Sequence, residues 1–256
     1  MTQPPYSEKG SWILAKMGKK VLRPGGKELT LALIHKLRIN QQDSVVEFAP
    51  GIGWTAKRIL QQQPKQYFGI ELNAQAAQRL NHGISSPSSQ IIQTSAAHTN
   101  LPDQSVDKVI GEAMLTMQSK NQKLAITREA YRILKPKGYY AIHEIALQPD
   151  EIDTSLKNEI QKKMSHTSKL NARPLTSEEW CDLLKESGFQ IISIERRPMA
   201  LMKLSRIIVD EGLLGTLKIA FNILTHPQER TQVLTIRKLF STYKKNMNAI
   251  AIIAQK

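Results

Sequence analysis

Short apolar runs alternate with helical patterns through the first two thirds of the chain. Each run is short and apolar, as buried parallel strands are, and five occur, at 44–49, 66–71, 90–94, 106–112 and 139–145. Between most of them, apolar residues recur at helical spacing, at 54–62, 74–80 and 121–134. Strands that alternate with helices predict an α/β fold with a parallel sheet covered by helices on both faces.

The alternation ends after the fifth strand. A polar helix is predicted at 150–164, and Thr176 or Ser177 can cap a helix that carries Glu178 and Glu179 in its first turn. A sixth strand is predicted at 190–195 and a seventh at 248–255, with a helical pattern between them. We therefore predict three parts, which are a helical arm at 1–40, a sheet domain at 41–197 and 246–256, and a helical insertion at 198–245.

The composition agrees with a globular α/β protein. The 256 residues are 41% hydrophobic and 23% charged, which is ordinary for a globular chain. The single cysteine, Cys181, excludes an internal disulfide and argues against a cysteine metal cluster, so we expect no metal. The sequence has neither an apolar run long enough to span a membrane nor a secretory pattern at the N-terminus, so we expect a cytoplasmic protein.

Positive charge is concentrated near the C-terminus. The formal net charge is +14, and residues 196–245 carry ten Lys or Arg against three acids, which is half of that excess. Such a balance favours contact with polyanions or with anionic lipid surfaces.

Two glycines and a proline stand between the first strand and the following helix, in the stretch Glu47-Phe48-Ala49-Pro50-Gly51-Ile52-Gly53. Glycine removes the Cβ that would hold a ligand away, and a helix N-terminus offers free N–H donors. The turn therefore predicts a site for a polar or anionic ligand. It matches the G-x-G-x-x-G dinucleotide motif poorly, because Ala49 precedes Gly51.

The turn resembles the nucleoside-binding loop of class I S-adenosylmethionine-dependent methyltransferases, acid-x-G-x-G-x-G, with Ala49 in place of the first glycine. That alanine implies that the backbone there does not need a positive φ. The segments LPDQSVDKVI (101–110) and EAYRILKPKGYYAIHE (129–144) resemble the family's passages into its fourth and fifth strands. The resemblance, to a bacterial small-molecule subgroup similar to methyltransferase type 11, implies a Rossmann-like, seven-stranded, mostly parallel sheet with a helical insertion before the last strand.

The resemblance also implies S-adenosyl-L-methionine as the cofactor. Glu71 ends the second strand, where a carboxylate can accept both ribose hydroxyls, although a solvated acid would look the same. Ser95 stands where the family often has an acid for the adenine amino group. The full set of expected cofactor residues is Glu47, Phe48, Ala49, Pro50, Gly51, Gly53, Glu71, Leu72, Ser95, Ala96, Glu112 and Met114.

Methyl transfer from a sulfonium depends mainly on alignment and shielding, and it needs a base only when the acceptor keeps its proton. Ligands of open α/β sheets bind beyond the carboxyl ends of the strands. That rule selects His143 as candidate base and Glu112 as a catalytic or cofactor-binding acid, with Met117, His143 and Arg173 facing the acceptor. The alternatives are a histidine bonded to loop backbone, an acid that caps a helix, and a surface arginine. Arg23 could bind the methionine carboxylate, unless it too lies on the surface.

The insertion at 198–245 leaves three interpretations open: ordinary core packing, a lid over an apolar acceptor, and a basic surface resting on an anionic membrane. We expect a methyltransferase acting on a small, even apolar, molecule. Nucleic acid is disfavoured, because Gly111-Glu112-Ala113-Met114 replaces the motif of amino-methylating enzymes and aromatics are only 5%. A non-catalytic binding module and a nicotinamide oxidoreductase are further alternatives. The acceptor and the choice between monomer and homodimer stay open.

Overall fold

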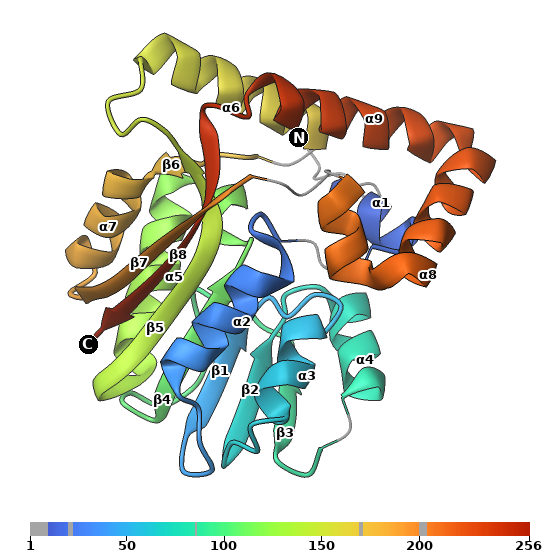
Figure 1. Ribbon diagram of the computed structural model, residues 1–256. Coiled ribbons are helices and arrows are strands. Elements are labelled where there is room, and N and C mark those ends of the chain that lie inside the picture. Colours follow the sequence, from blue (N-terminus) through green and yellow to red (C-terminus); the bar gives the residue numbers. More distant parts are fainter. Residues whose placement is uncertain (1–9, 20–22, 85, 169–170, 200–203) are drawn as a thin grey trace.

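A central sheet organises the molecule, and a computed structural model describes its residues 10–19, 23–84, 86–168, 171–199 and 204–256 (Figure 1). The strand order is β3-β2-β1-β4-β5-β8-β7, and a short strand β6 pairs with β5. The strands are β1 (Ser44–Phe48), β2 (Gln66–Ile70), β3 (Ser89–Ile92), β4 (Val106–Glu112), β5 (Leu134–Leu147), β6 (Leu175–Thr176), β7 (Gln190–Pro198) and β8 (Met247–Gln255). Strands β3 to β5 are parallel along this order, and β8 is antiparallel to β5 and β7. The predicted mostly parallel α/β sheet is confirmed, with β6 as an addition.

Helices cover both faces of the sheet (Figure 1). One face carries α2 (Gly26–Leu37), α3 (Trp54–Leu60) and α4 (Ala74–Gly83), and the other carries α5 (Lys120–Ile133) and α7 (Ser177–Glu186). Neighbouring strand residues alternate between two cores, since Val45 packs with the first set of helices and Val46 with the second. Both are fully buried, as is the pair Ala141 and Ile142 on β5.

Local sequence signals explain several helix boundaries. Thr176 caps α7 and forms a capping box with Glu179, as the predicted cap and first-turn acids require. Ser119 caps α5 by accepting a hydrogen bond from the Gln122 N–H. Strand β5 begins at Leu134, earlier than the predicted residue 139, and its Lys-Pro-Lys-Gly stretch is an irregularity at which the pairing with β4 shifts register between Val106 and Lys108.

A layer of helices lies over the carboxyl edge of the sheet (Figure 1). It comprises α1 (Gly10–Lys16), α6 (Thr154–Ser168), α8 (Leu204–Thr225) and α9 (Pro227–Thr242), and it has its own apolar core around Leu14, Met164 and Ile236. We call these four helices the cap. Residues 1–9 of the predicted arm and 200–203 of the predicted insertion lie outside the described residues. Within the described part of the chain, every helix falls short of the length and apolarity needed to cross a bilayer.

Candidate functional site

The carboxyl ends of four parallel strands meet along one rim. Phe48 is in register with Ile70 on one side and with Gly111 on the other, and Ile70 is in register with Ile92. The residues that follow these positions therefore lie side by side, and they include the turn at 49–53, Glu71 and Glu112. The β3–β4 connection begins at the same rim. The topology thus brings together segments that are far apart in the sequence, from the turn at 49–53 to Glu112.

The turn after β1 is built from left-handed backbone. Ala49, Gly51 and Gly53 have φ values of 51°, 61° and 76°. The expectation that Ala49 does not need a positive φ is therefore wrong, and an L-residue held there costs about 1 kcal/mol or more. A Cβ on Gly53 would come within 3.0 Å of Leu80, whereas a Cβ on Gly51 would meet only the Ala49 carbonyl oxygen, at 3.9 Å. The Gly51 side of the turn is therefore open, and a ligand can approach the backbone there.

Glu47 and Phe48 lie beneath this turn rather than on its surface. Glu47 is buried on β1 and its Oε2 accepts a 2.7 Å hydrogen bond from the Tyr67 hydroxyl. Burial raises the pKa of Glu47 to about 7, although the Tyr67 hydrogen bond opposes this. Phe48 is fully buried and packs edge-on against Tyr140. These two expected cofactor residues support the turn from below.

Glu71 begins the β2–α4 connection and is almost completely buried. Its Oε1 accepts a 3.0 Å hydrogen bond from the Asn73 N–H, and the Asn73 side chain in turn caps α4. This fixes the carboxylate at the rim beside the turn. Its neighbour Leu72 is 71% exposed and so presents an apolar surface at the same edge.

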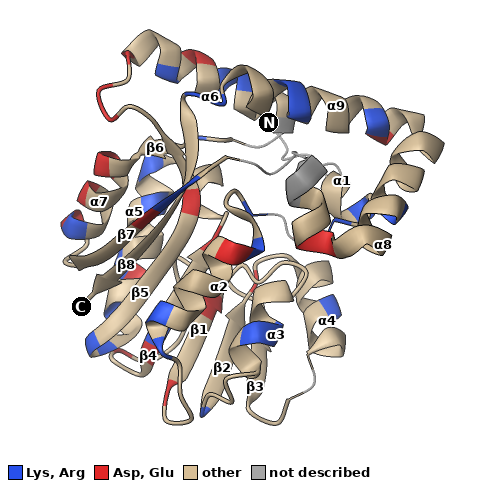
Figure 2. Cartoon of the chain, in the orientation of Figure 1, with Lys and Arg blue, Asp and Glu red and all other residues tan. Residues whose placement is uncertain are grey.

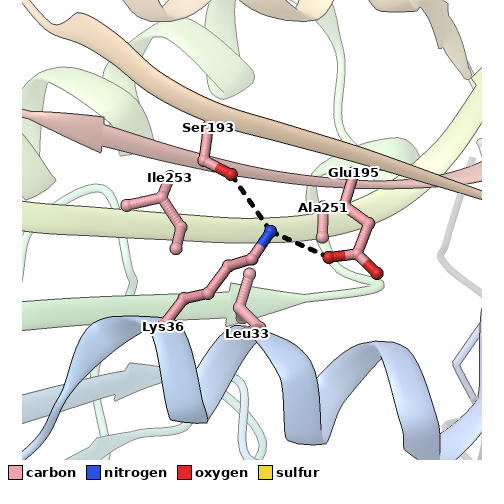
Figure 3. Close-up of a pocket in the computed structure, with 6 residues that line it drawn as sticks. All are labelled: Leu33, Lys36, Ser193, Glu195, Ala251 and Ile253. Carbon is pink, nitrogen blue, oxygen red and sulfur yellow. Dashed lines mark hydrogen bonds and ion pairs between the residues drawn. The ribbon is translucent and has the colours of Figure 1, made fainter.

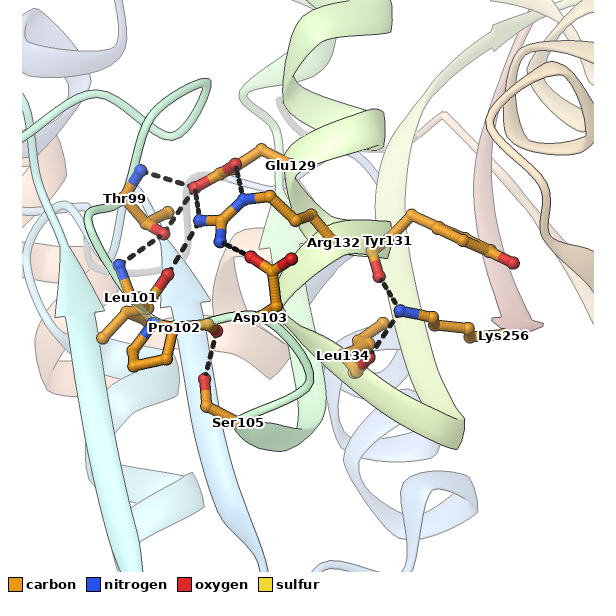
Figure 4. Close-up of polar contacts among 10 residues, drawn as sticks. All are labelled: Thr99, Leu101, Pro102, Asp103, Ser105, Glu129, Tyr131, Arg132, Leu134 and Lys256. Atoms are coloured by element: carbon orange, nitrogen blue, oxygen red, sulfur yellow. Dashed lines mark hydrogen bonds and ion pairs between the residues drawn. The ribbon is translucent and has the colours of Figure 1, made fainter.

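Ser95 and Ala96 follow β3 and are both partly buried. The Ser95 hydroxyl oxygen accepts a 3.2 Å hydrogen bond from the Ala97 N–H, which holds the loop in a local turn. The next residues of the loop are anchored to α5 (Figure 4). There, Glu129 accepts hydrogen bonds from the Thr99 N–H and hydroxyl and from Arg132, which also donates to the Leu101 carbonyl and to Asp103.

The charges of this anchor reinforce one another. Burial alone would raise the pKa of Glu129, but the hydrogen bonds from Arg132 and Thr99 outweigh it and lower the pKa to about 2. A separate contact in the same region joins the C-terminal Lys256 ammonium to the carbonyls of Tyr131 and Leu134 (Figure 4). The loop that carries Ser95 and Ala96 is therefore held against a rigid helix.

Glu112, at the end of β4, is the centre of a buried polar network. Its Oε2 accepts from Arg23 Nε at 2.7 Å and from the Thr55 hydroxyl at 2.6 Å. Its Oε1 accepts from the Thr30 hydroxyl at 2.5 Å and from His143 Nδ1 at 2.9 Å. Four donors fill the acceptor capacity of a carboxylate. Burial alone would raise the pKa of Glu112, but the Arg23 charge and the hydrogen bonds outweigh it, so the pKa lies far below its usual range.

His143 belongs to this network. Its side chain is fully buried, and its Nε2 accepts a 3.2 Å hydrogen bond from the Gly25 N–H. With Nε2 as acceptor, Nδ1 carries the proton that Glu112 accepts, which is a neutral tautomer with both nitrogens engaged. This corresponds to the alternative of a histidine bonded to loop backbone. Because both ring nitrogens are engaged, this arrangement favours a role for His143 in positioning its partners over taking a proton from a methyl acceptor.

Arg23 is buried, which excludes the alternative of a surface arginine. Besides the Glu112 ion pair, its Cζ lies 5.7 Å from the Trp54 ring centroid, over the residue that follows the glycine turn. Sequence reasoning missed Thr30 and Thr55 as partners of Glu112, and neither residue carries a local signal for that contact. The network brings the N-terminal arm onto the rim.

Two further rim segments are tied together by Glu144. This fully buried carboxylate accepts hydrogen bonds from the N–H groups of Met114, Leu115 and Thr116 and from the Thr116 hydroxyl, and so fixes the start of η2 (Leu115–Met117). Burial raises the pKa of Glu144 despite these bonds. Met114, which is buried, is thereby fixed next to Glu112 at the rim.

The expected acceptor residues Arg173 and Met117 lie at the junction of rim and cap. The Arg173 N–H donates to the Thr116 carbonyl at 2.7 Å, while its exposed side chain contacts Asn171 through Nε at 3.0 Å. Met117 is half-buried against the core of the cap. The structure therefore places Arg173 and Met117 near one another through the 114–117 segment, and His143 below them in the buried network.

Helix α8 of the cap is fastened to residues on both sides of Arg23 along the chain. Lys19 lies 3.7 Å from Asp210 and 3.8 Å from Glu211, and the Lys27 N–H donates to Asp210 at 3.0 Å. The Asn222 amide donates to the Met17 carbonyl at 3.1 Å. A change in the position of α8 would therefore act on the segment that carries Arg23.

A small crevice elsewhere does not belong to this rim. It lies between α2 and strands β7 and β8, and the Lys36 side chain enters it and contacts Ser193 at 3.2 Å and Glu195 at 2.9 Å (Figure 3). Its remaining lining is apolar, from Leu33, Ala251 and Ile253. Because the lysine already pairs with both polar groups, we interpret the crevice as a packing feature.

Comparisons with known proteins show which proteins this chain is similar to. Residues 46–142 match the family described as "Methyltransferase domain". An uncharacterized protein of Haemophilus influenzae is 32% identical over 253 residues, which cover 97% of this chain and 98% of that protein.

Solved structures show the same fold. A phosphoethanolamine N-methyltransferase 2 of Haemonchus contortus, in complex with phosphomonomethylethanolamine and S-adenosylhomocysteine, matches with a TM-score of 0.72 at 18% identity. The match covers 99% of this chain but 58% of that one. A protein described as a sarcosine dimethylglycine methyltransferase, from Galdieria sulphuraria, matches with a TM-score of 0.69 at 16% identity over 96% of this chain and 84% of that one.

Proposed function

Because the chain belongs to the class I S-adenosylmethionine-dependent methyltransferases, we propose that the rim binds S-adenosyl-L-methionine and that the protein methylates a small molecule. The observation that carries the proposal is the register of β3, β2, β1 and β4, which sets the open Gly51 backbone beside the Glu71 carboxylate. When bound, the cofactor supplies an activated methyl group.

The residues present fit this cofactor. Gly51 leaves room for a ligand against the backbone, since the nearest atom to its missing Cβ is 3.9 Å away. Glu71 offers a carboxylate for two adjacent ribose hydroxyls. Ser95 and Ala96 would lie against the adenine, and the exposed Leu72 would cover its ribose side.

Arg23 would hold the cofactor's carboxylate. It is the cation that the buried network fixes at the rim, and its Nε is already committed to Glu112 at 2.7 Å. A guanidinium carries further N–H donors in a planar fork that suits a carboxylate. Glu112, which already accepts four hydrogen bonds, would act by orienting Arg23 rather than by touching the cofactor.

No general base is needed for an acceptor that loses its proton unaided, so catalysis would rest on alignment and exclusion of water by the cap. His143 would then position the Gly25 backbone and Glu112 instead of taking a proton from the acceptor. Arg173 and Met117 would face the acceptor, one with a charge and one with an apolar surface. A small molecule that combines an anionic and an apolar part is the acceptor class that these two residues favour.

Two ligands that differ in one half of the cofactor test these roles by calorimetry. S-adenosylhomocysteine carries both the nucleoside and the amino acid, whereas 5′-methylthioadenosine lacks the amino acid. Glu71→Gln should weaken both ligands, because both contain the ribose hydroxyls. Arg23→Met should weaken S-adenosylhomocysteine by about tenfold or more and leave 5′-methylthioadenosine nearly unchanged, since it removes one charge-assisted contact.

Glu186→Gln, at an exposed acid on α7, is the matched control and should change neither affinity. Equal loss of both ligands in Arg23→Met would remove Arg23 from the carboxylate role. Unchanged binding in Glu71→Gln would contradict the placement of the ribose. Transfer of a labelled methyl group to a pool of small polar and apolar metabolites, and not to RNA, is the expected activity.

A further inference from the structure

Helix α8 turns an apolar face outward. In the part of the helix that follows Gly212, five large hydrophobic side chains are exposed, and Leu214 and Leu224 are 83% and 70% exposed. Ile208 and Val209, before Gly212, are exposed as well, and the five that follow it are Leu213, Leu214, Leu217, Phe221 and Leu224. At 3.6 residues per turn these positions fall within an arc of about 100° on one side of the helix. We call this set the α8 ridge.

The ridge is not a misplaced core face, because the opposite side of the same helix is the one that packs. Ile219 and Thr216 are buried, and Ile219 lies against the turn at Gly18 that follows α1. Asn222 reinforces that contact through its hydrogen bond to Met17. Gly212, with φ 75° and ψ 173°, interrupts the helix just before the ridge and sets the direction of the second half. The inner face is therefore satisfied while the outer face stays uncovered.

Charges around the ridge are of one sign. The described acids of α8 and α9 are Asp210, Glu211 and Glu229, and each is paired with a lysine of the N-terminal arm. The described cations of the same two helices, Lys218, Arg230, Arg237 and Lys238, are exposed. Figure 2 shows positions of Lys and Arg along α9 in blue. On α9, the half-exposed Leu234 has Arg230 one turn before it and Lys238 one turn after it.

We propose that α8 and α9 form a docking surface for an anionic lipid bilayer. The ridge would enter the boundary between headgroups and acyl chains, and the exposed cations beside it would meet the lipid phosphates. An anionic bilayer suits an apolar face that exposed cations flank, because the described acids of these two helices are paired with lysines. A second copy of this chain fits less well, because a two-fold contact through the ridge would bring the two cationic borders together. The proposal does not depend on the methyl-transfer reaction.

Vesicle flotation of the full chain tests this proposal. Vesicles of phosphatidylcholine alone are compared with vesicles that also contain phosphatidylglycerol, each at low and at high salt. Binding should require phosphatidylglycerol and should fall at high salt, because the electrostatic part is screened. Leu217→Ser combined with Phe221→Ser should reduce partitioning by about tenfold or more, since two apolar side chains no longer enter the bilayer.

Two matched controls separate the ridge from general surface effects. Ile192→Ser with Ile194→Ser removes two comparably exposed apolar side chains from the edge strand β7 and should leave partitioning unchanged. Arg237→Gln with Lys238→Gln should weaken binding, whereas Arg128→Gln with Lys185→Gln, at exposed cations on α5 and α7, should not. Thermal unfolding and S-adenosylhomocysteine affinity, measured on each variant, confirm that the fold is intact.

Several results would overturn the proposal. They are equal binding to neutral and anionic vesicles, absence of binding to both, and equal loss in the β7 control. A dimer in solution that the ridge variant converts to a monomer, seen by light scattering, would assign the ridge to self-association instead. RNA binding that depends on the same leucine and phenylalanine would likewise assign it elsewhere.

Discussion

Replacing Glu112 by glutamine tests whether the buried network holds the arm on the rim. The substitution keeps the shape of the side chain but removes the charge that faces Arg23, which is itself buried. It also turns one acceptor atom into a donor, although Glu112 accepts from four donors in the structure. An uncompensated buried charge and at least one unsatisfied donor should together lower the free energy of unfolding by about 3–5 kcal/mol.

Urea unfolding followed by circular dichroism at neutral pH measures this loss. Domains have total stabilities of about 5–15 kcal/mol, so the variant should remain folded with a clearly lower midpoint. Glu195→Gln is the matched control, because its ion pair with Lys36 has a similar length of 2.9 Å but is solvent-exposed. An exposed pair of this kind contributes about 0–1 kcal/mol.

A double-mutant cycle with Arg23→Met isolates the ion pair itself. If the two charges interact as the 2.7 Å contact indicates, the double variant should be about 2–3 kcal/mol more stable than the sum of the single losses predicts. Additive losses would refute the pairing. A loss below about 1 kcal/mol in Glu112→Gln would refute the whole account of the network, since no buried charge would then be left without its partner.

Three further predictions concern stability. Burial raises the pKa of Glu47 from 4.5 to about 7, so the folded state keeps a proton that the unfolded chain loses, and the free energy of unfolding falls as the pH rises from about 5 to 7. Glu47→Gln should abolish this fall and raise the free energy of unfolding at pH 8 by up to about 3 kcal/mol in urea unfolding. An unchanged pH profile would contradict the burial argument. The pKa of Glu129 is lowered to about 2, so the contribution of its carboxylate to folding stability is present above about pH 5 and is lost as the pH falls toward 2. Glu129→Gln should lower the free energy of unfolding at pH 7 by about 1–2 kcal/mol, a value reduced because Arg132 is 35% exposed. In the same titration the variant should be less sensitive to acid than the parent. Trp180 is fully buried and its Nε1 donates to a β5 carbonyl at 3.0 Å. Trp180→Phe should lower the free energy of unfolding by about 2–4 kcal/mol, because it leaves a cavity and an unpaired carbonyl, and the melting temperature should fall with it. A loss below about 1 kcal/mol would show that the site collapses around the smaller ring.

The apolar pattern of the chain was sufficient to predict the α/β fold. The short apolar run at 44–49 predicted the strand that the structure shows as β1 (Ser44–Phe48), and caps such as Thr176 act through atoms only a few residues away. Signals of this kind are local, so they can be read without knowing the fold. The same reasoning failed for Ala49, because the need for a positive φ came from the path of the turn and not from the residue type.

Which distant side chains share a site depends on the tertiary structure. Glu112 and Arg23 are 89 residues apart, and Gly25 and His143 are 118 apart, so no spacing in the sequence indicates that they meet. Likewise, the apolar residues of α8 form a helical pattern in the sequence, but only packing against the turn after α1 determines that Ile219 points inward and Leu214 outward. Local propensity determines the elements, whereas the burial of one face and the pairing of buried charges depend on contacts made after the elements assemble.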